Sequence, residues 1–137
     1  ALGRGLAAHL QRGDLVALSG DLGAGKTVLA RGILQGLGYA GEVASPSYAL
    51  VHPYDPPVVR LPVSHVDLYR LDDADETQEL ALGDYLMDGL LLIEWPDRLG
   101  DALWPHSLRL TIEILEDGAR RLTADVPEAW TDRWSQI

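Results

Sequence analysis

The chain has no cysteine among its 137 residues, so disulfide bonds, thiolate catalysis and cysteine-ligated zinc are excluded. It also lacks the run of about 20 apolar residues that a membrane-spanning helix needs. Positive charge is scarce, because the formal net charge is −10. Independent binding of nucleic acid requires a basic surface that neutralises phosphates. We therefore expect no membrane association and no independent DNA binding, and we expect any role with RNA to pass through a partner.

The rest of the composition is that of a folded domain. Hydrophobic residues make up 47% of the chain, which favours a globular protein over a disordered one. A length of 137 residues suits one domain with its own core, so we expect residues 1–137 to form a single unit. The first twelve residues do not have the form of a signal peptide, and we expect a cytoplasmic protein.

Lysine is almost absent as well. The chain has one, Lys26, while its ten other basic residues are arginines. This lysine stands in the segment Gly20-Asp21-Leu22-Gly23-Ala24-Gly25-Lys26-Thr27, which fits the phosphate-binding pattern G-x-x-x-x-G-K-[ST]. A compact ammonium can lie beside a triphosphate where a broad, planar guanidinium cannot. The segment therefore predicts a site for a nucleoside triphosphate.

The flanks of this segment support the same interpretation. An apolar run over 14–19 predicts a buried strand before it, and apolar residues at helical spacing over 27–37 predict a helix after it. Gly38 is expected to end that helix. A strand, a glycine-rich loop and a helix in this order form the P-loop, whose amides and helix dipole attract phosphate.

The residues of the loop have separate expected tasks. The glycines let backbone N–H groups approach the phosphates closely. We expect Lys26 to reach the β- and γ-phosphates of the nucleotide, and the Thr27 hydroxyl to bind Mg²⁺. The Asp21 side chain is expected to serve the turn. The nucleotide-binding residues predicted in this part of the chain are Asp21, Leu22, Gly23, Ala24, Gly25, Lys26, Thr27 and Val28.

A nucleotide hydrolase also needs carboxylates opposite the loop, which hold Mg²⁺ or orient water. Glu94 follows four aliphatic residues, 90–93, that predict a buried strand. Burying a charged side chain costs free energy, so a carboxylate at this position suggests a functional role. Asp67 lies in an alternating segment, 63–69, that puts it on one strand face with His65. The alternatives are that Glu94 is a surface acid beyond its strand and that Asp67 belongs to a solvated sheet face.

These elements predict an α/β protein with the P-loop NTPase fold, in three layers around a mixed central sheet. We expect the proline-rich stretch 52–62 to be an exposed loop or hairpin end, and Trp130 with Trp134 to pack the tail 127–137 on the domain as a short helix. A late antiparallel hairpin is expected around Asp117-Gly118. The predicted helices span 2–12, 27–37 and 75–87, and the predicted strands or extended segments span 14–19, 43–51, 63–69, 90–93, 108–115 and 121–126.

Four segments in order along the chain make a recognisable set. They are the P-loop, Ser45-Pro46-Ser47-Tyr48-Ala49-Leu50-Val51, His65-Val66-Asp67-Leu68-Tyr69-Arg70-Leu71 and Ile93-Glu94-Trp95-Pro96. By themselves, the serines of the second segment fit a simple turn. Taken together, the segments closely resemble the TsaE (YjeE) family of bacterial P-loop ATPases, over most of the chain.

The resemblance implies an ATPase that acts in the threonylcarbamoyladenosine modification of tRNA. It implies the proteins TsaB and TsaD as partners, through which the chain would act on tRNA only indirectly. It also implies ATP or ADP and Mg²⁺ as cofactors. Lys26, Asp67 and Glu94 become the implied catalytic residues, and Thr27, Asp67 and Glu94 the implied metal ligands.

The resemblance also bears on residues whose pattern alone says little. Ser47 stands where the family usually has threonine, and its hydroxyl is implied in sensing phosphate or Mg²⁺. His65 is expected to be a structural hydrogen-bonding residue rather than a base. Trp95 is expected either to shape the nucleotide site or a partner surface, or to be a core aromatic.

Three other functions share parts of this pattern. A small-molecule kinase has the same loop, but usually needs an acceptor pocket and an arginine-bearing lid, for which the chain is short. A regulatory GTPase of the Asn-Lys-x-Asp kind is disfavoured, because the chain contains no asparagine. A nucleotide-sensing adaptor, in which hydrolysis is incidental, stays open.

Overall fold

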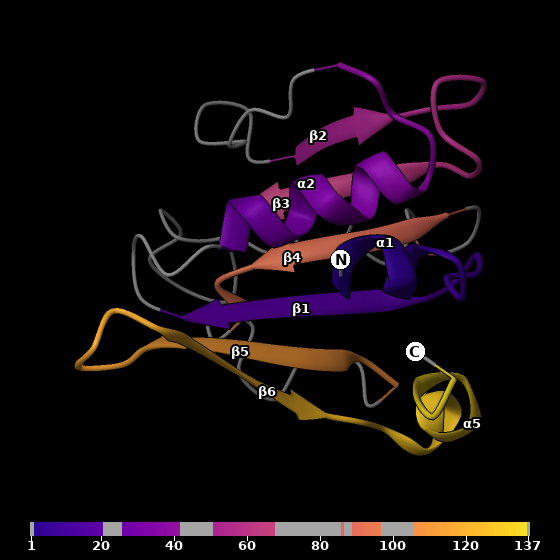
Figure 1. Ribbon diagram of the computed structural model, residues 1–137. Coiled ribbons are helices and arrows are strands. Elements are labelled where there is room, and N and C mark those ends of the chain that lie inside the picture. The colour runs from indigo at the N-terminus through magenta and orange to yellow at the C-terminus, as the bar shows by residue number, and fades with distance from the viewer. Residues whose placement is uncertain are drawn as a thin grey trace, which may run out of the picture.

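A computed structural model describes residues 2–20, 26–41, 51–67, 86, 89–96 and 106–136. Its centre is a six-stranded sheet in the order β2-β3-β4-β1-β5-β6 (Figure 1). Strands β3, β4, β1 and β5 are parallel to one another, while β2 and β6 pair antiparallel at the two edges. The predicted mixed α/β sheet is thereby confirmed. The strands are β1 (Leu15–Gly20), β2 (Val51–Tyr54), β3 (Val63–Asp67), β4 (Leu90–Glu94), β5 (Leu108–Ile114) and β6 (Arg120–Asp125).

Two helices, α1 (Leu2–Ala7) and α2 (Lys26–Gly36), pack together on one face of this sheet (Figure 1). Alternate residues of the central strands join them in one apolar cluster, and the intervening residues on the opposite face are buried as well. Burial of both faces is typical of the parallel centre of a three-layer α/β fold. None of the described helices is long and apolar enough to cross a membrane.

Helix α2 follows the predicted pattern almost residue by residue. Ala30, Ile33 and Leu34 are fully buried on its inner side. It ends in a Schellman motif: the Tyr39 N–H donates to the Leu34 carbonyl at 3.0 Å, and the Gly38 N–H donates to the carbonyl of Gln35 at 3.0 Å. Gly38 has a φ of +109°, a conformation that only glycine adopts without strain. The expected stop at Gly38 is therefore confirmed.

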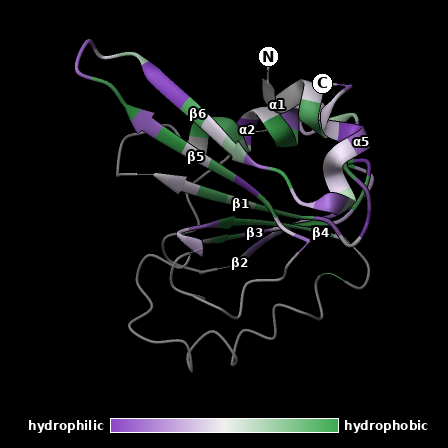
Figure 2. Cartoon of the chain, turned by 90° about the horizontal axis from the view of Figure 1, so that it is seen from below, coloured by the Kyte–Doolittle hydropathy of each residue, from purple (hydrophilic) through white to green (hydrophobic). Residues whose placement is uncertain are grey.

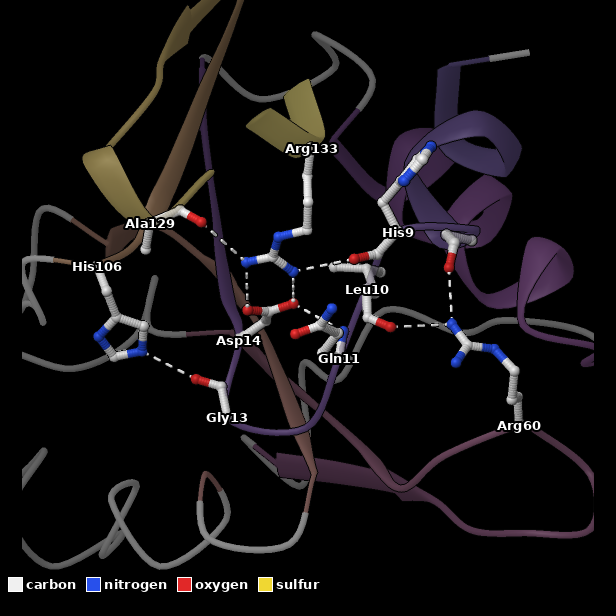
Figure 3. A network of polar contacts seen from close by, with 10 residues as sticks. His9, Leu10, Gln11, Gly13, Asp14, Arg60, His106, Ala129 and Arg133 are labelled. Atoms are coloured by element: carbon white, nitrogen blue, oxygen red, sulfur yellow. Dashed lines mark hydrogen bonds and ion pairs between the residues drawn. The ribbon is translucent and has the colours of Figure 1, made fainter. Parts of the chain in front are cut away.

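The first helix is shorter than predicted. Periodicity predicts a helix over 2–12, but α1 ends at Ala7. The chain then forms a tight turn, in which the Leu10 N–H donates to the Ala7 carbonyl at 3.3 Å. Arg60, from the segment between β2 and β3, donates to the carbonyls of Ala7 and Leu10 at 2.9 and 3.0 Å (Figure 3). A distant side chain thus satisfies the carbonyls that further helical turns would have used.

The proline-rich stretch begins within a strand and continues as a hairpin end, so only the expectation of a simple loop over 52–62 is corrected. Residues 51–54 form β2, and Pro53 pairs in register with Ser64 of β3. Proline is tolerated there because β2 is an edge strand, where a missing donor can face away from the sheet. The remainder, 55–62, is the connection between the two strands. The extended segment predicted over 43–51 and the helix predicted over 75–87 fall almost wholly outside the described residues.

The late hairpin is confirmed, with β5 and β6 joined around Asp117 and Gly118. Its outer part is hydrophilic, whereas hydrophobic residues gather on the central strands (Figure 2). After β6 the chain forms a 3-10 helix (Glu128–Trp130) and α5 (Thr131–Trp134). Trp130 is fully buried and Trp134 packs against the core. Both tryptophans therefore pack on the domain as predicted, although the α-helix begins only after Trp130.

An ion pair joins this tail to the segment that precedes β1 (Figure 3). Arg133 donates to both carboxylate oxygens of Asp14, at 2.6 and 3.0 Å, and to the carbonyl of His9 at 2.9 Å. Its guanidinium lies 3.8 Å from the ring centre of Trp130. The Gln11 N–H donates to Asp14 at 2.7 Å. One arginine therefore fixes both the tail and the entry to the first strand.

Candidate nucleotide-binding site

The candidate site lies at the edge of the sheet where the parallel strands end. Gly20, Asp67 and Glu94 are the last residues of β1, β3 and β4. In the ladders, Glu94 pairs with Leu18 on one side and with Asp67 on the other. Ligands of open α/β sheets bind outside this edge. The backbone thus brings together three positions that the sequence places far apart.

Lys26, the first residue of α2, occupies this edge. Its side chain is 5% exposed, and its ammonium donates to the carbonyl of Gly20 at 2.5 Å. The Nζ atom also lies 4.3 Å from the ring centre of Trp95, within the range of a cation–π contact. The ammonium is therefore held between the end of β1 and the residue that follows β4. Negative phosphate is favoured at this point, because the N-terminus of α2 adds its own partial positive charge.

Trp95 turns the chain sharply after β4. Its φ of +62° lies in the left-handed region, which costs a residue other than glycine about 1–3 kcal/mol and is concentrated at functional sites. Its N–H donates to the Leu18 carbonyl at 3.2 Å, which ties the end of β4 to β1. Between the two roles left open by the sequence, the contact with Lys26 favours a part in the site.

Glu94 is 3% exposed, so it is not the surface acid that the alternative interpretation required. Its Oε2 atom lies 2.6 Å from Nε2 of His65, a residue with no exposed surface. His65 is therefore the hydrogen-bonding residue that the sequence predicts. The sequence did not predict that Glu94 is the partner of His65. This contact depends on the register of β3 against β4, which no local sequence pattern reveals.

Several predicted site residues are not brought together by the described structure. Asp21, Leu22, Gly23, Ala24 and Gly25 lie outside the described residues, and so does Ser47. The backbones of Thr27 and Asp67 are placed in α2 and β3, but their side chains are not described. Val28, which is 64% exposed, is accessible in the first turn of α2. Their predicted contacts with nucleotide and metal stay predictions.

A metal ion at this edge would need oxygen donors from side chains, from a bound nucleotide or from water. Within the described ranges, no three histidine, cysteine or acidic side chains converge on a point that could hold one. Mg²⁺ does not need such a cluster, because it is usually bound by one or two carboxylates together with phosphate oxygens and water. The buried carboxylate of Glu94, at the same edge as Lys26, is a hard oxygen donor of the required kind. The residues present therefore fit a nucleotide-bound Mg²⁺.

The parallel strands, the helix that begins at Lys26 and the acid that ends β4 are those of the P-loop NTPase fold. Comparison with known proteins gives the particular family. Residues 1–122 match the family described as "Threonylcarbamoyl adenosine biosynthesis protein TsaE", and the chain belongs to the TsaE family.

Individual relatives agree with this assignment. The tRNA threonylcarbamoyladenosine biosynthesis protein TsaE of Streptomyces coelicolor is 46% identical over 118 residues, which cover 82% of this chain and 76% of that protein. The protein of the same name from Haemophilus influenzae is 40% identical over 111 residues, or 80% of this chain and 68% of that protein. The crystal structure of YdiB from Bacillus subtilis superimposes with a TM-score of 0.82 and 28% identity, over 98% of this chain and 82% of that one.

Proposed function

We propose that the chain, as a single domain over 1–137, is a Mg²⁺-dependent ATPase. In this proposal it binds ATP, hydrolyses it to ADP and phosphate, and thereby supports the TsaB and TsaD proteins in the threonylcarbamoyladenosine modification of tRNA. The observation that carries the proposal is the placement of one buried ammonium, Lys26, and one buried carboxylate, Glu94, at the same edge of the sheet.

The chain's own residues account for phosphate binding. In the proposed complex, Lys26 moves its hydrogen bond from the Gly20 carbonyl to the β- and γ-phosphates, while the amides of 21–27 surround them. Glu94, together with Thr27 and Asp67, would hold Mg²⁺. When bound, the metal neutralises charge that develops on the transferred phosphoryl group.

Hydrolysis requires an attacking water that is oriented in line with the γ-phosphate. In this proposal Glu94 or Asp67 orients this water, either by accepting a hydrogen bond from it or through the metal that they would hold. The sequence shows no obvious arginine finger, and two of its described arginines, Arg60 and Arg133, are engaged in contacts with the N-terminal segment. We therefore expect slow turnover by the chain alone and faster turnover in the presence of its partners.

The role in tRNA modification rests on the family assignment and on charge. A chain with a formal net charge of −10 is repelled by RNA phosphates unless a basic protein stands between them. TsaB and TsaD are the partners that the family resemblance implies. In this scheme they hold the tRNA, while the chain described here supplies energy from ATP.

The proposal is tested by phosphate release and by ATP affinity, measured with and without the TsaB and TsaD proteins of the same organism. Lys26→Ala should abolish binding of ATP, since no other lysine can replace it. Glu94→Gln keeps the shape of the side chain and an oxygen that can accept from His65. It should lower turnover by about 100-fold or more while ATP affinity stays close to that of the wild type.

Arg31→Ala is the matched control, because Arg31 is an exposed residue of the same helix as Lys26, and its loss should change neither quantity. Unchanged ATP affinity and turnover in Lys26→Ala would refute the nucleotide site. Transfer of phosphate to a small acceptor, instead of its release, would establish a kinase in place of an ATPase.

A further inference from the structure

The contact between His65 and Glu94 places two polar side chains beside the apolar core. Both side chains are buried, and each has an apolar neighbour on one side and a polar neighbour on the other, because His52 pairs with His65 and Asp67 pairs with Glu94. Leu92 pairs with His65 in register, Leu18 pairs with Glu94, and Val63 precedes His65 on the same face of β3. Leu18, Val63 and Leu92 all belong to the core cluster beneath α1 and α2. An apolar residue in place of His65 would extend this cluster along β3, next to Leu92.

A buried polar pair in such a place does not favour stability. Replacing a buried ion pair or polar pair by packed apolar residues is often neutral or stabilising, because neither partner then loses its hydration. The imidazole is also incompletely satisfied. Its Nδ1 atom is buried and has no hydrogen-bond partner among the described residues. The presence of His65 is therefore better explained by what it does to Glu94 than by packing.

The geometry decides which nitrogen of the ring donates. A carboxylate has only acceptor atoms, so the 2.6 Å contact with Glu94 requires a hydrogen on Nε2. The Nε2–H therefore points at Oε2 of Glu94, and this hydrogen bond holds the carboxylate in place.

We infer that His65 is a positioning residue for Glu94. Its Nε2–H donates to Oε2 of Glu94 and so fixes the orientation of the carboxylate toward the metal or the attacking water. This inference rests on the proposed function, because it specifies how the same carboxylate is held during ATP hydrolysis. It adds a residue from β3 that touches neither the nucleotide nor the water.

Three variants separate positioning from packing. In His65→Gln, the side-chain Nε2 stands the same number of bonds from the backbone as the donor of histidine, so it can still reach Glu94. In His65→Asn the amide is one bond shorter and falls short of Glu94, and His65→Leu has no donor. We expect turnover to fall about 10- to 100-fold in the asparagine and leucine variants, and the glutamine variant to restore most of it. The KM for ATP should change less than about threefold, because Lys26 and the loop bind the phosphates.

Thermal unfolding and ATP-analogue affinity of each variant control for damage to the fold. The Gln and Asn variants form the decisive pair if the leucine variant fails to fold, since both are amides. Equal turnover in this pair, or wild-type turnover in the leucine variant, would overturn the positioning role. A rise in KM that accounts for the whole loss would overturn it as well.

A second measurement does not depend on catalysis. Long-range proton–nitrogen correlation spectra of the nucleotide-free wild-type protein, with ¹⁵N-labelled histidine, report which ring nitrogen carries the hydrogen. We expect His65 to carry a hydrogen on Nε2, and the absence of a hydrogen there would overturn the assignment. A wild-type chain that hydrolyses no ATP with its partners overturns the proposed function, whereas hydrolysis that does not respond to His65 overturns only this inference.

Discussion

The ion pair between Asp14 and Arg133 makes a quantitative prediction about stability. Arg133→Met keeps an apolar stem against Trp130 but removes both hydrogen bonds to Asp14 and the one to His9. Removing one partner of a fully buried pair costs about 3–5 kcal/mol. Because the side chains of Arg133 and Asp14 are 18% and 9% exposed, we take the lower end, about 3 kcal/mol, to allow for solvent screening.

Chemical unfolding in urea measures this loss directly, as a shift of the midpoint at constant m-value. The same loss should lower the Tm by about 10 °C for a domain of this size. The exposed pair of Arg121 and Glu113 is the matched control, since its side chains are 60% and 46% exposed. Arg121→Met should change the free energy of unfolding by less than about 1 kcal/mol.

A double-mutant cycle tests the assignment of this energy to the pair. Asp14→Ala and Arg133→Met should each destabilise, while the double variant should lose less than the sum, with a coupling energy above about 1 kcal/mol. A coupling energy near zero would show that the contact of Asp14 with Arg133 contributes little. A loss of less than about 0.5 kcal/mol in Arg133→Met would refute the reasoning as a whole.

Two further predictions concern packing and pH. A Cβ on Gly89 would collide with the carbonyl oxygen of Pro62 and come within 2.9 Å of the Pro62 Cβ. Gly89→Ala should therefore lower the free energy of unfolding, measured by urea titration, by about 1–3 kcal/mol. Wild-type stability of this variant would contradict the predicted collision. Burial raises the pKa of the Tyr54 hydroxyl, and Tyr39 adds to the effect. The unfolded chain therefore loses this proton at a lower pH than the folded chain does. The free energy of unfolding should keep its full value below pH about 10 and should decrease as the pH rises above it. Tyr54→Phe should flatten that decline in Tm measured from about pH 9 to 11, and an unchanged profile would count against Tyr54 as its source.

The parts of the fold that were predictable from the sequence rest on local signals. The buried strands β1 and β4 are short, nearly continuous apolar runs, and α2 is a helical stripe between a glycine-rich loop and Gly38. Lys26 and Glu94 are each identified by the element beside them. Their position at one edge then follows from the rule that parallel strands end at the same side of a sheet.

The features that were missed depend on contacts between distant residues. The early end of α1 reflects carbonyls bound by Arg60, about 50 positions away. The strand at Pro53 exists because β3 is available to pair with it. The partner of His65 is 29 positions distant and becomes evident only with the register of β3 and β4. No propensity or periodicity contains this information, because each contact is fixed by the assembled sheet.

The placement of β1 in the middle of the sheet has a consequence for the order of folding. Leu15 pairs with Leu91, and Val16 pairs with Leu108, so both described neighbours of β1 are synthesised long after it. Arg133 reaches back 119 positions to Asp14. Contacts of such long range form slowly. The strand that leads into Lys26 is therefore synthesised before the strands that enclose it, so the candidate site is assembled only after β4 and β5 have been made.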